Sequence, residues 1–308
     1  VSNSEPVVSS VAISPNTNVY NDTVLTCTAT ATDDDETVTP TYEWLVNGTT
    51  HSGSTLDLST TTAMPNDVIT CTASVSDSNG GSDSSSTTIT VDNRDPSVSG
   101  VSISPTTVYT NSLVSCSGTI ADDDGETPTH TVNWTVNGNS IGAGGSLQLD
   151  NTMVGVGDVL TCTLSITDGY GGSDSDTSTV TIDNTAPVVD SITLGPSSPK
   201  KHDTLSCEAV ASDVDGDSVT LAFGWTNQTS GVTYTSTNTT TNSAELDLTT
   251  VTVLSDDIVE CMVTATDSHG DSASDSATIQ IVNSAPTFTS AAAITPSTGV
   301  YTNTVLSC

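Results

Sequence analysis

Apolar and polar residues alternate strictly in segments that recur along the chain. In the first such segment Leu25, Cys27 and Ala29 take every second position, with threonines between them. A period of two puts apolar side chains on one face of an extended chain and polar ones on the other, which predicts a half-buried β-strand. The alternating segments that contain a first cysteine are 25–31, 114–120 and 205–211.

Two further strands follow each of these segments. A tryptophan comes 17 or 18 residues after the first cysteine, and a second cysteine comes on another alternating stretch. Cysteine, tryptophan and cysteine on inward positions within about 90 residues are typical of an immunoglobulin-like β-sandwich, whose inter-sheet disulfide packs on the tryptophan. We therefore predict an all-β chain of tandem immunoglobulin-like sandwiches. The predicted disulfides are Cys27–Cys71, Cys116–Cys162 and Cys207–Cys261, packed on Trp44, Trp134 and Trp225.

The repeats set the domain organisation. Proline-led segments begin at Pro6, Pro96, Pro187 and Pro286, with spacings of 90, 91 and 99 residues, and similar short linkers precede the last three. The predicted domains are 1–5 (tail and linker of a preceding repeat), 6–95, 96–186 and 187–285 (repeats 1 to 3) and 286–308 (start of repeat 4). Cys308 is then the first cysteine of repeat 4, and we expect the chain to be a window on a longer tandem array.

Charge excludes several classes of partner. The chain has three Lys or Arg residues against 37 Asp or Glu, for a formal net charge of −34. Such a surface repels nucleic-acid phosphates and anionic lipid headgroups. No apolar run approaches the roughly 20 residues that span a bilayer, so we expect no direct membrane insertion in this segment. Disulfides persist in oxidising compartments, which predicts an extracellular or cell-surface location.

The acidic residues gather in two loops of each repeat, after the first and after the second cysteine strand. Oxygen ligands on turns that contain glycine suit Ca²⁺, which takes 6–8 of them. The candidate calcium ligands are Asp213, Asp215, Asp217 and Asp267, with Asp122, Asp124, Asp33 and Asp35 as a weaker set. The alternative is a solvated acidic surface, as expected of a protein secreted into saline water.

Two short motifs resemble a known family. The loop at 211–217, Ala-Ser-Asp-Val-Asp-Gly-Asp, and the linker at 183–187, Asp-Asn-Thr-Ala-Pro, are similar to those of bacterial and archaeal PKD-like and cadherin-like surface repeats. The resemblance implies an extracellular array stiffened by calcium at the joints. The disulfides and Val282, where the other linkers have Asp, depart from that pattern. The first two loops lack the alternating Asp-x-Asp-Gly-Asp, which favours repeat 3 as the calcium site.

The search for catalytic chemistry is negative. The four histidines lie at non-equivalent places, and the sequence has no HExxH, no CxxC and no glycine-rich phosphate loop before a helix. We therefore predict that this segment is not an enzyme and needs no cofactor other than calcium. Candidate N-glycosylation sequons begin at Asn21, Asn47, Asn133, Asn227 and Asn238. The threonine-rich insertion at 233–241 fits a glycosylated hairpin or a plain β extension.

The sequence favours a structural role. We predict a segment of a long extracellular multi-repeat protein that forms a stalk, sheath or filament and associates with neighbouring repeats or subunits. One alternative is an adhesin or glycan-binding array, for which Tyr170 and Tyr234 are the candidate aromatic contacts. Another is a set of spacers beside an enzyme domain outside the segment.

Overall fold

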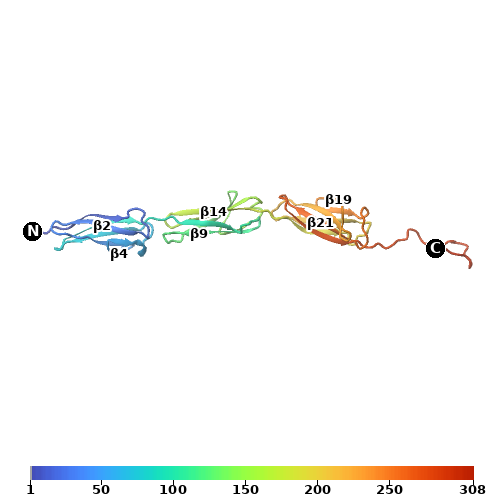
Figure 1. The fold of residues 1–308 in the computed structure, drawn as a ribbon, viewed down its shortest axis with the longest axis horizontal. Coiled ribbons are helices and arrows are strands. Elements are labelled where there is room, and N and C mark those ends of the chain that lie inside the picture. Colours follow the sequence, from blue (N-terminus) through green and yellow to red (C-terminus); the bar gives the residue numbers. More distant parts are fainter. Residues whose placement is uncertain (1) are drawn as a thin grey trace. The chain divides into compact units, whose positions relative to one another are not determined.

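The computed structural model describes residues 2–308, apart from the side chains of Asn238 and Thr239. The chain divides into two compact units, the first ending at Asp183 and the second beginning at Asn184. The first unit contains two β-sandwiches and the second contains one (Figure 1). The predicted all-β, immunoglobulin-like architecture with three inter-sheet disulfides is thus confirmed.

Repeat 1 consists of two antiparallel sheets. One has the order β1-β2-β5 and the other β4-β3-β6-β7. The strands are β1 Val7–Ser14, β2 Val24–Thr32, β3 Thr41–Val46, β4 Thr49–Ser52, β5 Thr55–Asp57, β6 Val68–Ser76 and β7 Ser82–Thr90, and the short 3₁₀ helix η1 spans Leu58–Thr60.

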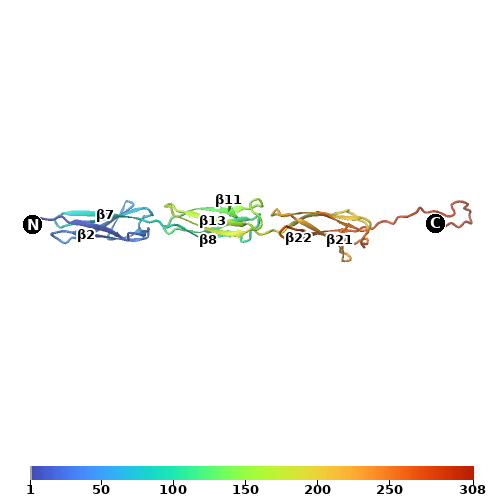
Figure 2. The same ribbon diagram turned by 90° about the horizontal axis from the view of Figure 1, so that it is seen from above.

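Repeat 2 has the same two-layer plan, with sheets β12-β9-β8 and β11-β10-β13-β14. Figure 2 shows these two layers face to face. The strands are β8 Ser97–Ser104, β9 Leu113–Ala121, β10 Thr129–Val136, β11 Asn139–Ala143, β12 Ser146–Gln148, β13 Val159–Thr167 and β14 Ser173–Thr181.

Repeat 3 carries one additional strand, β19. Its sheets have the orders β15-β16-β20-β19 and β18-β17-β21-β22. The threonine-rich insertion supplies β19 and most of β18, so it is a β extension in this structure, whereas the side chain of the Asn238 sequon lies outside the described part. The strands are β15 Val188–Gly195, β16 Thr204–Ser212, β17 Thr220–Asn227, β18 Val232–Tyr234, β19 Asn238–Thr239, β20 Ser243–Asp247, β21 Ile258–Thr266 and β22 Ser272–Gln280.

Residues 286–308 differ from the three repeats. Within the described part of this segment, the pairing consists of an isolated bridge between Thr295 and Ser307. Cys308 is exposed and has no disulfide partner there. The repeat boundaries drawn from the sequence stay a prediction, although β1–β7, β8–β14 and β15–β22 fall inside 6–95, 96–186 and 187–285.

The core of each sandwich is a disulfide with an indole beside it. In repeat 1 the Cα atoms of Cys27 and Cys71 lie 6.5 Å apart, across the two sheets. Trp44 is fully buried and lies directly opposite Cys71 in the β3–β6 register. Trp134 faces Cys162 and Trp225 faces Cys261 in the same way. Side chains directly opposite on neighbouring strands have Cβ atoms about 5 Å apart, so each indole packs against a disulfide.

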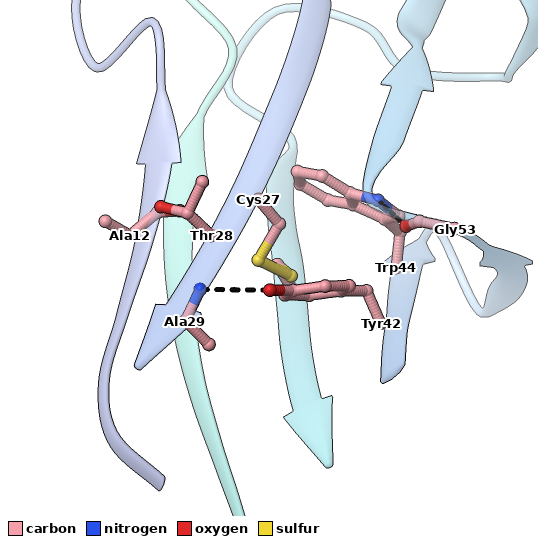
Figure 3. Close-up of a disulfide and its surroundings, with 8 residues drawn as sticks. Ala12, Cys27, Thr28, Ala29, Tyr42, Trp44 and Gly53 are labelled. Carbon is pink, nitrogen blue, oxygen red and sulfur yellow. Dashed lines mark hydrogen bonds between the residues drawn. A yellow bond between two sulfur atoms is a disulfide. The ribbon is translucent and has the colours of Figure 1, made fainter. Parts of the chain in front are cut away.

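A tyrosine completes the core of repeat 1. The backbone N–H of Ala29 on β2 donates to Tyr42 Oη on β3 over 3.1 Å, which links the two sheets beside the disulfide (Figure 3). Repeat 2 has Val132 at the position of Tyr42, and a cleft of about 660 Å³ opens there. The residues that line this cleft include His130 but no carboxylate.

The indole N–H finds a partner in two repeats out of three. Trp44 Nε1 donates to the Gly53 carbonyl over 2.9 Å, and Trp134 Nε1 donates to the Gly144 carbonyl over 2.8 Å. Both glycines have positive φ angles, +117° and +109°, which only glycine adopts readily, so the turn depends on this residue type. In repeat 3, strand β18 lies opposite Trp225, whose buried Nε1 has no partner within the described residues.

This difference predicts unequal tolerance of Trp→Phe. Trp44→Phe and Trp134→Phe lose an indole hydrogen bond, whereas Trp225→Phe removes an unpaired buried donor. The first two should destabilise their repeats by about 1–2 kcal/mol more than Trp225→Phe does. Hydrogen exchange of the full chain in denaturant, resolved by peptide, measures each repeat separately. Equal decreases in the free energy of unfolding of all three repeats would contradict the assignment of the indole hydrogen bonds.

Candidate cation sites in the acidic loops

Two acidic loops of each repeat lie beside the linker that leads into the repeat. In repeat 2 they connect β9 to β10 and β13 to β14. The linker residue Asn93 donates from Nδ2 to Asp168 Oδ2, at the start of the second loop, over 2.8 Å. Asn184 bonds Asp267 in the same way over 2.9 Å, and Asn3 bonds Asp77 over 2.8 Å. The linker asparagine is therefore part of the same constellation in all three repeats.

The second loop is a tight turn around one carboxylate. Asp168 Oδ1 accepts the backbone N–H groups of Tyr170, Gly171 and Gly172 at 2.7–2.8 Å. A Cβ on Gly172 would collide with this carboxylate and with Asp95, which explains the second glycine of the Gly-Gly pair. Asp267 Oδ1 is held in the same way by three backbone N–H groups. The Asn184 hydrogen bond, followed by these backbone donors, lowers the pKa of Asp267.

In repeat 2 three carboxylates converge. Oxygen atoms of Asp122, Glu126 and Asp168 all lie within 4.8 Å of one another. Asp122 Oδ2, Glu126 Oε2 and the linker Asn93 Oδ1 are buried and have no hydrogen-bond partner in the described part of the chain. Burial raises the pKa of Glu126, and the negative charges of Asp122, Asp168 and Asp124 raise it further. Buried oxygen atoms without partners are costly, so this set of oxygens is suited to a positively charged group.

Repeat 3 has an equivalent convergence. Carboxylate oxygens of Asp213, Asp215 and Asp217 lie within 4.8 Å of one another. Asp213 Oδ2 and Asn184 Oδ1 are buried and lack a partner among the residues described. Burial is the main cause that raises the pKa of Asp213, and Asp215 and Asp217 add to it. Asp217 Oδ2 also lies 2.8 Å from His269 Nδ1, at the rim of the cluster.

Repeat 1 arranges its acidic loop differently. Asp33 Oδ2 is again buried without a partner in the described structure. The carboxylate of Glu36, however, accepts hydrogen bonds from Ser78 N and Ser78 Oγ at 2.6 and 2.8 Å. Asp35 Oδ2 accepts the N–H of Ser4 over 2.6 Å. No cluster of three carboxylates forms among the described residues of this repeat.

In the structure, some of the predicted calcium ligands cluster together, and other carboxylates join them. Asp213, Asp215 and Asp217 come together, and Asp122 joins two carboxylates that the sequence had not singled out as ligands. Asp124 and Asp267 lie outside both clusters: the carboxylate of Asp124 binds Arg94, and that of Asp267 binds Asn184 and its own turn. As metal ligands, all the predicted aspartates stay predictions.

The donor chemistry fits a hard cation. The unpaired atoms are carboxylate and amide oxygens, and neither cluster contains a cysteine or histidine ligand. Calcium prefers such all-oxygen sets, whereas zinc and copper sites use nitrogen or sulfur. The residues present therefore fit calcium, which the PKD-like and cadherin-like resemblance implies.

The candidate aromatic contacts for a glycan are not free. Tyr234 packs on the core of repeat 3, and its Oη donates to the Thr252 carbonyl over 2.6 Å. Tyr170 is half-buried beside the repeat 2 cluster, and its pKa is raised by burial and then by the charge of Glu126.

In two of the predicted glycosylation sequons the asparagine is hydrogen-bonded within its own repeat. Asn47 and Asn227 each donate to the aspartate four residues before the second cysteine, Asp67 and Asp257, over 2.7 and 2.8 Å. In repeat 2, Asn137 makes the same bond to Asp158 over 2.7 Å, although it is not in a sequon. The bond is thus a feature of the repeat. Asn21 Nδ2 is bonded as well, to the Asp124 carbonyl, whereas Asn133 lies exposed on β10.

Comparisons with known proteins give fold-level similarity. No protein-family model matches the chain, and no curated protein matches it. The structure of Sidekick-1 immunoglobulin domains 1–5 is similar over 92% of this chain and 60% of that one, at 14% identity and a TM-score of 0.34. A 1.5-MDa bacterial ice-binding adhesin is similar over 91% and 99%, at 17% identity and 0.32. Extracellular domains 3–5 of Drosophila OTK are similar over 84% and 90%, at 15% identity and 0.31.

The asparagine–aspartate bond predicts which sequon substitutions affect stability. Asn227→Ala leaves the nearly buried Asp257 without its amide donor and should destabilise repeat 3 by about 1–3 kcal/mol. Asn133→Ala removes a sequon from an exposed strand position and should change stability by less than about 0.5 kcal/mol. Denaturant unfolding of the two variants measures both values. Similar decreases in the free energy of unfolding for the two variants would show that the Asn227–Asp257 hydrogen bond does not contribute to stability.

Proposed function

We propose that this chain is a structural segment of an extracellular multi-repeat protein, in which the acidic loops of repeats 2 and 3 bind calcium and fix how the linker enters each of these two repeats. The observation that carries the proposal recurs in repeats 2 and 3: a cluster of three carboxylates has at least one buried, unpaired oxygen, and the linker asparagine of the same repeat has another. The clustered carboxylates lie at the end of the repeat where the linker enters. An arrangement of this kind sets joints and offers no constellation for catalysis.

The proposed location is extracellular. Each repeat has a disulfide between its sheets, and such bonds persist in oxidising compartments. None of the helices described is long and apolar enough to cross a membrane. The net charge of −34 keeps separate copies soluble and argues against anionic partners.

Calcium would be held by oxygens from the linker and from both acidic loops in repeat 2, and from the linker and the first acidic loop in repeat 3. In repeat 2 the proposed ligands are Asn93, Asp122, Glu126 and Asp168, and in repeat 3 they are Asn184, Asp213, Asp215 and Asp217. When bound, the ion supplies the positive charge that balances the crowded carboxylates. The linker asparagine already bonds the second loop through its amide nitrogen, so its carbonyl oxygen is free to join the ion. Binding would thereby tie the linker to both loops at once.

Lateral association is the second part of the proposal, and its occupant is another copy of this chain. The outer face of β10, β13 and β14 presents rows of aligned hydroxyl residues, such as Thr131, Ser165 and Ser175. Its twelve central positions hold serine, threonine and one asparagine, with no charged residue: Thr129, Thr131, Asn133, Thr135, Thr161, Thr163, Ser165, Thr167, Ser173, Ser175, Thr177 and Thr179. Because the chain is otherwise so acidic, two copies can approach each other through this neutral face with the least repulsion.

Terbium luminescence tests the calcium site of repeat 2. Terbium substitutes for calcium, and Tyr170, two residues after Asp168, is placed to sensitise it. We expect luminescence that calcium displaces, and at least about tenfold weaker binding in Glu126→Gln, which loses one charged ligand. Asp123→Asn is the matched control, because it removes a charge from an exposed position of the same loop. Equal binding by the two variants, or no luminescence in the native chain, would refute the site.

Sedimentation of the full chain tests the lateral face. Thr163→Glu places a charge at the centre of the neutral face and should reduce self-association at least about tenfold, since like charges across an interface repel. Thr119→Glu adds the same charge to an exposed position of β9, on the other sheet, and should leave association unchanged. The proposal fails if the native chain stays monomeric at millimolar concentration, or if the two variants behave alike.

A further inference from the structure

Arg94 is one of only three basic residues in the chain, and it lies in the linker between repeats 1 and 2. Its guanidinium makes three charge contacts. Nη2 lies 2.6 Å from Asp22 Oδ1, Nη1 lies 3.0 Å from Asp124 Oδ1, and Cζ lies 4.1 Å from the centre of the Tyr20 ring. The side chain of Asp124 is fully buried and that of Asp22 is 60% exposed.

These partners belong to different repeats. Tyr20 and Asp22 come from the loop between β1 and β2 of repeat 1, and Asp124 comes from the loop between β9 and β10 of repeat 2. An uncharged hydrogen bond also joins the two repeats: Asn21 Nδ2 donates to the Asp124 carbonyl over 2.7 Å. One guanidinium therefore connects the end of repeat 1 to the acidic loop of repeat 2.

The other linkers show what the guanidinium adds. The backbone N–H of Arg94 donates to Asp124 Oδ2 over 2.7 Å, and Ser4 and Thr185 make the same bond to Asp35 and Asp215 over 2.6 Å. Folding of the acidic loop thus needs only the backbone of this residue. The charged side chain occurs in one linker, where it reaches back to the preceding repeat.

The next linker lacks both charged residues of this contact. In the linker from repeat 2 to repeat 3, the position of Arg94 is taken by Thr185, and the position of Asp22 is taken by Asn111. Neutral residues replace both partners, while Tyr109 keeps the position of Tyr20. Within one chain, the arginine and its exposed carboxylate thus behave as a pair.

We propose that Arg94 is a built-in cation that locks repeat 1 onto repeat 2 without a metal ion. The planar guanidinium serves two carboxylates and an aromatic face at once, which a lysine ammonium could not do with the same geometry. The buried Asp124 gives the contact its strength, because a buried carboxylate cannot easily lose its only cationic partner. The array then contains joints of two kinds, one locked by an ion pair and one with neutral residues at the same two positions. This proposal does not rest on calcium binding.

The decisive experiment compares the native chain with Arg94→Thr in EDTA. Threonine is the residue of the next linker, so the variant keeps the backbone bond to Asp124 and the loop should fold. Residual dipolar couplings report whether repeats 1 and 2 align as one body. We expect one common alignment tensor for the native chain and two different tensors for Arg94→Thr. Two tensors in the native chain, or one tensor in both proteins, would overturn the proposal.

Trypsin provides a second readout. The protease cleaves after Lys and Arg, so the chain offers sites only after Arg94, Lys200 and Lys201. A locked guanidinium cannot enter the protease pocket, and we expect cleavage after Arg94 to be at least tenfold slower than after the two lysines. Asp22→Asn, which copies the next repeat, should speed cleavage after Arg94 about two- to threefold, and Asp124→Asn should speed it more, with the lysine sites as internal controls. Unchanged rates in both variants would count against the lock.

Discussion

The disulfide that joins the two sheets is the interaction on which each repeat depends. A sandwich of about 90 residues buries a modest core, and here the core is one indole, one disulfide and a thin shell of aliphatic side chains. Loops of 44 to 54 residues closed by these bonds contribute on the order of 4 kcal/mol each in the chain-entropy model. Because the tryptophan lies directly opposite the second cysteine, the same few residues fix both the sheet register and the distance between the sheets.

Because the disulfide and the tryptophan stabilise the core, the repeat tolerates electrostatic repulsion in the loops at the ends of the sandwich. The loops collect carboxylates that repel one another, and these carboxylates have three kinds of surroundings. Backbone N–H groups surround Asp168 and Asp267, the guanidinium of Arg94 neutralises Asp124, and the oxygens of Asp122, Glu126 and Asp213 are left without partners. The last group contains the proposed calcium ligands, and calcium binding there would connect the stability of a loop to the behaviour of a joint.

The sequence predicts the fold far better than the candidate site. Alternation with period two and the Cys–Trp–Cys order are local signals, so they identified the two cysteine strands and the tryptophan strand of each repeat and all three disulfides. The loops were also recognisable, yet neither Glu126 nor the linker asparagines Asn93 and Asn184 stood out as ligands. The repetition of asparagine in every linker was the available signal. The carboxylate of Asp124 binds Arg94 and does not join the cluster. This depends on how the linker folds against the loop, which a local sequence pattern does not predict.

The sequons Asn47 and Asn227 illustrate the same limit from the other direction. A three-residue pattern matched, but the equivalent Asn137 makes the same bond to its aspartate without any sequon. Comparison between repeats therefore separates what the fold requires from what one copy adds. By that standard the backbone bond at position 94 belongs to the fold, whereas the guanidinium is specific to one joint.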